Sequence, residues 1–134
     1  MFKLGDKLEV NKINNINPIV LAFVGDAVYS LFVRERLAFS SDAKTGELNK
    51  LATSEVRASA QAKFIEEIKD LLTEEEIRVF KRARNAKKTT RAKSASVVEY
   101  NMSTGFEAVL GYLYIKGDID RLNFLLNKGI KDED

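Results

Sequence analysis

Apolar residues recur at the spacing of an α-helix over most of this chain. Pro18 follows Asn17 as the first residue of a helix follows its N-cap, and apolar side chains then return at Leu21, Val24, Val28, Leu31 and Phe32. This pattern predicts a helix over residues 18–37. The stretch YLYI at 112–115 contains strand-forming residues, but it continues a helical pattern and we interpret it as helix.

Residues that interrupt or cap helices divide the next part of the chain. The polar residues 40–42 end the first helix, and the composition of 43–72, rich in Ala, Glu and Lys, predicts a second helical region. Thr53 and Ser54 mark a predicted interruption within this region. Thr73 and Glu76 have the spacing of a capping box, so a third helix is predicted to begin there and to continue into a basic segment.

The last part of the chain predicts one loop and two helices. Residues 87–96, KKTTRAKSAS, are polar and lack apolar periodicity, which indicates a loop. A helix is then predicted to begin at Ser103 or Thr104 and to end at Gly117, and Asp118 caps a final helix that ends near Gly129.

These elements predict an all-α protein with a single domain. The chain has 134 residues, of which 45% are hydrophobic, and this is enough for one compact core but little more. We expect the core to extend over about residues 10–128 and the acidic tail at 129–134 to be frayed.

The composition excludes several kinds of functional site. The chain contains no cysteine and no histidine, which excludes disulfides, thiolate metal sites, imidazole general bases and the usual zinc ligands. Catalysis would therefore depend on carboxylates, hydroxyls, amines or a hard metal ion. No segment approaches the roughly 20 uninterrupted apolar residues of a membrane span, so we expect a cytoplasmic protein.

Positive charge is concentrated in one segment, although the whole chain has a formal charge of only +2. Residues 77–98 contain no acid, and the rest of the chain has more acids than bases. The positive side chains of this segment are Arg78, Lys81, Arg82, Arg84, Lys87, Lys88, Arg91 and Lys93. This distribution predicts an anion-binding surface, although a solvated helix face would have the same composition.

A single carboxylate, Asp26, stands in the apolar pattern of the first helix. Gly25 precedes it, and Ala22 and Ser30 lie four residues before and after it. Asp26 therefore falls on a strip of small side chains, where another helix could approach closely. Two structural roles also fit this residue: the cap of a helix that begins at Ala27, or the partner of a lysine or arginine.

Glu107 has a similar neighbourhood, with Thr104 three residues before it and Gly111 four residues after it. Two helices with such strips can cross with Asp26 and Glu107 facing each other. Facing carboxylates repel and raise each other's pKa unless a cation lies between them. Because the chain offers no histidine or cysteine, a hard, oxygen-liganded ion such as Mg²⁺ is the natural candidate. An exposed helical glutamate is the alternative interpretation of Glu107.

Five stretches of the chain form an ordered set of motifs. They are NPIVLAFVGDAVYSLFVRERL, LATSEVRASAQAKFI at 51–65, LTEEEIRVFKRARNAK at 72–87, YNMSTGFEAVLGYLY at 100–114, and the closing DIDRLNFLL. In order and spacing this set resembles the catalytic domain of ribonuclease III, and specifically its short bacterial branch, Mini-ribonuclease III. The resemblance extends over about residues 10–126, nearly the whole predicted domain.

The resemblance implies an all-helical, homodimeric endonuclease fold that cleaves double-stranded RNA with Mg²⁺. It also implies a catalytic domain without the separate double-stranded-RNA-binding domain of the larger enzymes, and little sequence remains after Lys128 to form one. The implied substrate is the stem flanking precursor 23S ribosomal RNA. Each subunit would cut one strand and leave 5′-phosphate and 3′-hydroxyl ends, and the need for a ribosomal protein bound to the substrate stays open.

The residues that match the acidic metal site of the family, and so the implied catalytic residues, are Asp26 and Glu107. Larger ribonuclease III enzymes have glutamates four and seven residues before the aspartate, where this chain has Ala22 and Ile19. They also have an aspartate three residues before the glutamate, where this chain has Thr104. The Mini branch typically has this reduced acidic set, which leaves the number of metal ions open, and the Thr104 hydroxyl would support the site through a bound water.

Without an accessory domain, the catalytic domain must bind the duplex itself. The residues expected to contact RNA are Arg82, Arg84, Lys87, Lys88, Arg91 and Lys93. Bulky apolar residues around the first helix fit either a subunit interface or a central core helix. Two other functions stay open at this stage, a catalytically silent double-stranded-RNA-binding module and a helical protein-interaction domain.

Overall fold

The computed structural model describes residues 7–40, 42, 44–88 and 96–130, and within these ranges it contains helices and no strand. The elements are α1 (Val10–Ile13), α2 (Pro18–Ser40), α3 (Thr45–Val56), α4 (Ala58–Ile68), the 3-10 turn η1 (Lys69–Leu71), α5 (Glu74–Asn85), α6 (Val97–Lys116) and α7 (Ile119–Gly129). The all-α prediction is confirmed. No helix in the described ranges combines the length and apolar character that a bilayer span requires.

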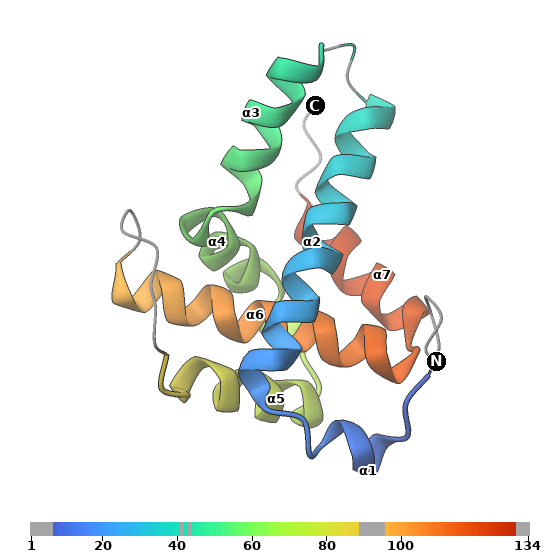
Figure 1. The fold of residues 1–134 in the computed structure, drawn as a ribbon, viewed down its shortest axis with the longest axis vertical. Helices are drawn as coiled ribbons and strands as arrows, with labels where there is room; N and C mark the ends of the chain where they lie inside the picture. Colours follow the sequence, from blue (N-terminus) through green and yellow to red (C-terminus); the bar gives the residue numbers. More distant parts are fainter. Residues whose placement is uncertain (1–6, 41, 43, 89–95, 131–134) are drawn as a thin grey trace.

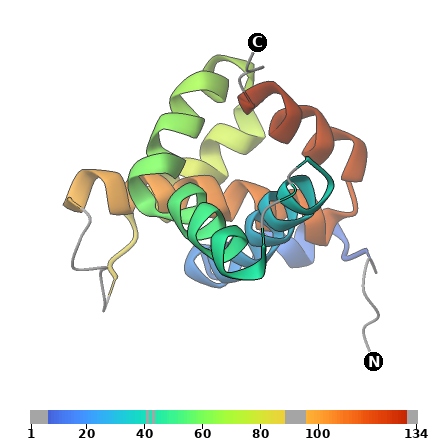
Figure 2. The ribbon, with the colours of Figure 1, turned by 90° about the horizontal axis from the view of Figure 1, so that it is seen from above.

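Helix α6 lies at the centre of the fold. It contacts α1, α2, α4, α5 and α7, and Figures 1 and 2 show these helices arranged around it. Every residue of 103–113 except Glu107 is buried. Because so many faces of this helix are covered, its rotation about its own axis is fixed by packing.

Helices α2 and α6 cross in backbone contact, and two glycines make this possible. A Cβ atom on Gly25 would lie 1.6 Å from the carbonyl oxygen of Glu107, and one on Gly111 would lie 2.0 Å from the carbonyl oxygen of Leu21. Both distances are far inside van der Waals contact, so only glycine fits at either position. The predicted close approach of the two small-residue strips is confirmed.

Three aromatic rings form the core beside this crossing. The ring of Phe106 lies 5.1 Å from the rings of both Tyr29 and Phe64, and the latter two are 5.6 Å apart. Edge-to-face and tilted ring contacts of this kind add to the stabilisation that burial of the rings provides. The cluster joins α2, α4 and α6 directly behind Glu107.

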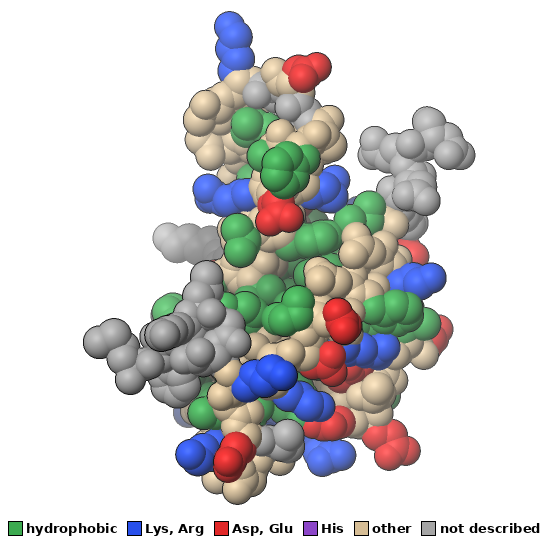
Figure 3. Space-filling view, turned by 90° about the vertical axis from the view of Figure 1, so that its right-hand side faces the viewer, with side chains coloured by type: hydrophobic (Ala, Val, Ile, Leu, Met, Phe, Trp, Pro, Cys, Tyr) green, Lys and Arg blue, Asp and Glu red, His purple; other side chains and the backbone are tan. Residues whose placement is uncertain are grey.

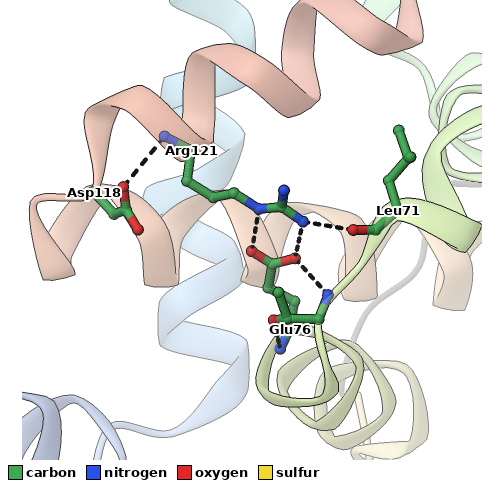
Figure 4. Close-up of polar contacts among 5 residues, drawn as sticks. Leu71, Glu76, Asp118 and Arg121 are labelled. Carbon is green, nitrogen blue, oxygen red and sulfur yellow. Dashed lines mark hydrogen bonds and ion pairs between the residues drawn. The ribbon is translucent and has the colours of Figure 1, made fainter.

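A buried ion pair connects α5 to α7 (Figure 4). The Arg121 guanidinium donates two hydrogen bonds of 2.8 Å to the Glu76 carboxylate and a third, of 2.6 Å, to the Leu71 carbonyl. The carboxylate also accepts from the backbone of Thr73, which completes the predicted capping box. Burial alone would raise the pKa of Glu76, but the hydrogen bonds from Arg121 and Thr73 outweigh burial and lower it.

The start of α6 differs from the prediction, because Ser96 and not Ser103 or Thr104 is its N-cap. The Ser96 hydroxyl accepts from the backbone of Glu99 and begins the helix at Val97. Ser103 and Thr104 lie inside the helix, where both hydroxyls donate to the Tyr100 carbonyl. The predicted loop at 87–96 is therefore followed at once by α6, and residues 89–95 of it lie outside the described residues.

The interruption between α3 and α4 lies at Arg57, a few residues after the predicted one. Arg57 has an extended backbone, whereas Thr53 continues α3 and donates to the Asn49 carbonyl. The other predicted boundaries agree with the structure: α2 extends three residues further than 18–37, and α7 has Asp118 as its N-cap. Gly117 ends α6 with a left-handed backbone, as a glycine C-cap does.

Charged side chains of both signs are interspersed on the face that Figure 3 shows, with hydrophobic side chains between them. The basic C-terminal end of α5 lies on the opposite, left-hand side of Figure 1, where the N-terminal end of α6 also lies. Arg78, at the other end of the basic segment, lines a pocket with Lys116 and Arg121.

The glycine contact between α2 and α6 predicts a large difference between two glycine-to-alanine substitutions. Gly25→Ala should lower the free energy of unfolding by more than about 3 kcal/mol, because the clash is with backbone and no side chain can move aside. Gly46→Ala in α3 is the control, since nothing lies within 4 Å of its Cβ position. It should be neutral or stabilising by up to about 1 kcal/mol. Urea unfolding measures both, and equal stabilities for the two variants would contradict the contact.

Candidate active site

Asp26 and Glu107 face each other across the crossing of α2 and α6. Both side chains line the same cleft, and the contact with Asp26 contributes to the raised pKa of Glu107. Asp26 is exposed at the surface of α2, whereas Glu107 is partly buried in the centre of α6. The facing arrangement that the sequence predicts is confirmed, and it depends on the glycine contact described above.

A cleft of about 410 Å³ opens at these two acids. Its walls come from α2, from the junction between α3 and α4, and from the first half of α6. Besides the acids, the polar residues that line it are Arg57, Gln61, Tyr100, Ser103 and Thr104. Arg57 is the one cation among these lining residues, so the cleft brings a carboxylate pair close to a single positive charge.

Without a bound cation, Glu107 keeps its proton at neutral pH. Burial, then the hydrogen bond and the charge of Asp26, raise the pKa of Glu107 to about 9, from an ordinary value of 4.5. Two ionised carboxylates this close repel each other, so the proton stays on Glu107 up to a pH well above its ordinary range. A cation placed between them would reverse this balance and favour the ionised forms.

Gln61 is a member of the site that the sequence interpretation missed. Its side chain is only 2% exposed, and its amide nitrogen donates to the Val56 carbonyl at 2.7 Å and to the Glu107 carboxylate at 3.4 Å. The signal in the sequence is its position: Gln61 lies four residues before Ile65 and seven before Ile68, on the buried face of α4. A polar residue on an otherwise apolar helix face indicates that it has a buried polar partner.

Thr104 lines the cleft, but its hydroxyl proton is used inside α6. The hydroxyl donates to the Tyr100 carbonyl at 2.9 Å. The oxygen keeps acceptor capacity toward the cleft. A water supported by Thr104, as the family resemblance implies, would therefore have to donate to it.

The residues expected to contact RNA have different surroundings. Arg82 and Lys87 are exposed at the end of α5, and the Arg84 guanidinium lies 5.6 Å from the centre of the Phe80 ring. Lys88 is partly buried and donates to the carbonyl oxygens at 83, 84 and 86, so it caps the C-terminus of α5. Burial lowers the pKa of Lys88. Arg91 and Lys93 lie outside the described residues.

The donor atoms of the cleft are suited to a hard metal ion. In the described ranges no group of three or more acidic, histidine or cysteine side chains gathers at one point, so Asp26 and Glu107 would be the only charged ligands from these residues. Both offer oxygen atoms on the cleft. Mg²⁺ is commonly held by one or two carboxylates with water and phosphate completing its coordination, and the residues present fit that pattern.

Comparison with known proteins shows the family of this chain. A family model for the ribonuclease III domain matches residues 19–118. The Mini-ribonuclease 3 of Clostridium tetani is 44% identical over 92% of this chain and 82% of its own length, and that of Streptococcus pneumoniae is 46% identical over 86% and 91%. This chain belongs to the Mini-ribonuclease III family. As a member of that family it is an endoribonuclease, which favours the enzyme over the binding-module and interaction-domain alternatives.

A solved structure supports the Mini-ribonuclease III assignment at the level of the fold. A protein from Fusobacterium nucleatum superposes with a TM-score of 0.77 at 30% sequence identity, and the match covers 87% of this chain and 93% of that one. The arrangement of helices around α6 is thus shared with a relative of known structure.

The raised pKa of Glu107 predicts how stability changes with pH when metal is removed with EDTA. The unfolded chain ionises Glu107 as the pH rises past its ordinary value of 4.5, whereas the folded protein keeps the proton until about 9. The stabilisation is therefore complete below the ordinary pKa and is lost as the pH rises through this window. Glu107→Gln lacks the ionisation and should lose less stability.

Thermal melting in EDTA at about pH 5 and about pH 8.5 measures the loss of stability in both proteins. Each kcal/mol corresponds to a change in melting temperature of roughly 3–5 °C for a domain of this size. Between these two pH values, the melting temperature of Glu107→Gln should fall by at least about 3–5 °C less than that of the native protein. Other titrating groups, including Glu76 with Arg121, are common to both proteins and cancel. Equal falls in melting temperature in the two proteins would contradict the raised pKa of Glu107.

Proposed function

We infer that this chain cleaves double-stranded RNA with Mg²⁺ in the cleft where Asp26 and Glu107 meet. The ribonuclease III family acts on double-stranded RNA and generally depends on a divalent metal ion. The observation that carries the proposal is the pair of carboxyl groups that line one cleft, in which the pKa of Glu107 is raised to about 9 by burial and by Asp26. Perturbed carboxyl groups that converge in a cleft are typical of catalytic sites.

In this proposal Asp26 and Glu107 hold the metal ion and have no need to act as general bases. The bound ion supplies a water of lowered pKa for attack on phosphorus and neutralises charge on the phosphate. Glu107 would have to be ionised to hold the ion, because only the deprotonated carboxyl is a metal ligand. Hydrolysis then leaves a 5′-phosphate and a 3′-hydroxyl, as the family resemblance implies.

The basic residues at the C-terminal end of α5, which lies on the left of Figure 1, would bind the backbone of the duplex. Arg82 and Lys87 are exposed there and are free of the helix-capping role that Lys88 has. A-form RNA presents phosphates and 2′-hydroxyls rather than readable base edges, so shape should dominate recognition. The proposed biological substrate is the stem that flanks precursor 23S ribosomal RNA, with a substrate-bound ribosomal protein as a further proposed partner and a cytoplasmic location.

The outer face of α2 supports the proposal that two chains form a dimer. Val20, Phe23, Ala27 and Leu31 recur at helical spacing on this face, and the three larger side chains are 50%, 79% and 63% exposed. A contiguous apolar stripe of this kind is typical of a protein interface. Phe23 also lines the cleft, so a partner on the stripe would lie beside the active site. A monomer at micromolar concentration in sedimentation velocity would contradict the dimer.

Cleavage of a labelled RNA duplex tests the proposed function directly. With Mg²⁺ the native protein should cut, whereas Asp26→Asn and Glu107→Gln should bind the duplex but cut at least about 100-fold more slowly, because each removes one charged metal ligand. A generic duplex and a precursor 23S stem, with and without ribosomal proteins, compare the substrates. A native-like cleavage rate in either variant would show that the substituted residue is not a metal ligand.

The salt dependence of duplex binding tests the basic end of α5. Arg82→Gln with Lys87→Gln should weaken binding in EDTA and reduce the slope of log affinity against log salt by about 0.9 for each lost phosphate contact, by analogy with B-form DNA. Lys50→Gln is the control, since Lys50 is exposed on α3, far from α5 in Figure 1. If the double variant and the control behaved alike, this surface would not contact RNA.

A further inference from the structure

The buried amide of Gln61 carries an inference beyond the two acids. Gln61 is on the inner face of α4 with Ile65 and Ile68, and an apolar side chain of similar length would fill such a position without polar atoms to satisfy. Its oxygen is buried and has no hydrogen-bond partner. An unsatisfied buried acceptor costs about 1–3 kcal/mol. The hydrogen bonds that the amide nitrogen donates must offset this cost.

The two acceptors of the Gln61 nitrogen fix which way the amide points. The Val56 carbonyl, at the C-terminal end of α3, lies 2.7 Å from that nitrogen, and a carbonyl can only accept. The amide nitrogen, and not its oxygen, therefore faces the Glu107 carboxylate at 3.4 Å. The amide joins the end of α3, the helix α4 and the acid on α6.

We propose that Gln61 is a positioning residue that holds the Glu107 carboxylate in the orientation needed for metal binding. The proposal rests on the function proposed for the acid pair. A carboxylate at the end of a glutamate side chain rotates broadly, and a donor on one of its oxygens restricts that rotation.

The test compares Gln61→Met with Ile65→Val in the same helix. Gln61→Met keeps the length of the side chain and removes both hydrogen bonds, whereas Ile65→Val disturbs the same buried face without touching Glu107. The readouts are the Mg²⁺ concentration for half-maximal thermal stabilisation without RNA, and the Mg²⁺ concentration for half-maximal cleavage. Both should rise about 10-fold or more in Gln61→Met, since loss of a group that orients a metal ligand typically has this effect.

The Ile65→Val protein should show a lower melting temperature but unchanged Mg²⁺ midpoints. If Gln61→Met lowered only the melting temperature and left both Mg²⁺ midpoints within twofold of the native values, the role of Gln61 would be limited to its hydrogen bond between α4 and the Val56 carbonyl of α3. That result would overturn the inference and leave the proposed function intact.

A second measurement needs no variant of Gln61 to fold. Gln61 is the only glutamine in the chain, so selective ¹⁵N-glutamine labelling gives one side-chain amide signal in an NMR spectrum. This signal should shift during a Mg²⁺ titration of the native protein with the same midpoint as the thermal stabilisation. No shift would overturn the inference. A native protein that neither binds Mg²⁺ nor cuts RNA would instead contradict the proposed function, and the inference with it.

Discussion

The backbones of α2 and α6 touch where Gly25 meets Gly111, and this contact sets how far apart the two acidic side chains stand. A side chain at either glycine would push the helices apart and separate the carboxyl groups with them. The same closeness withdraws Glu107 from water and brings it against Asp26, which is why its pKa is raised. One steric condition thus determines both the geometry and the protonation of the site.

The burial of α6 makes this geometry rigid. Because every residue of 103–113 except Glu107 is buried, the helix can neither rotate nor slide without disturbing the core. The rings of Tyr29, Phe64 and Phe106 fill the space behind the acid and join the three helices that form the cleft. A site carried on such an element is held in position before any ligand arrives.

Much of this architecture could be predicted from the sequence because its signals are local. The capping box at Thr73, the caps at Asp118 and Gly117, and the small-residue strips around the two acids are all short-range patterns. The start of α6 was predicted wrongly because Ser96 and Ser103 offer the same capping chemistry. The choice between them depends on whether the intervening turns are supported by other helices.

Gln61 shows where sequence interpretation ends. Its partner Glu107 is 46 residues away along the chain, and no local pattern reveals which residue of an amphipathic helix will meet a distant carboxylate. The break at Arg57 has the same origin. Thr53 and Ser54 have weaker helix propensity, but the chain turns where α4 must redirect its apolar face toward α6.

The raised pKa of Glu107 also bears on how this protein folds without a metal ion. With a proton on Glu107, the folded chain does not bury an ionised carboxylate beside Asp26, so folding does not have to wait for an ion. Small zinc domains behave differently, because they unfold when their metal is withheld. Under the proposed function, a shortage of Mg²⁺ would leave a folded, idle enzyme in reserve rather than an unfolded chain exposed to proteases.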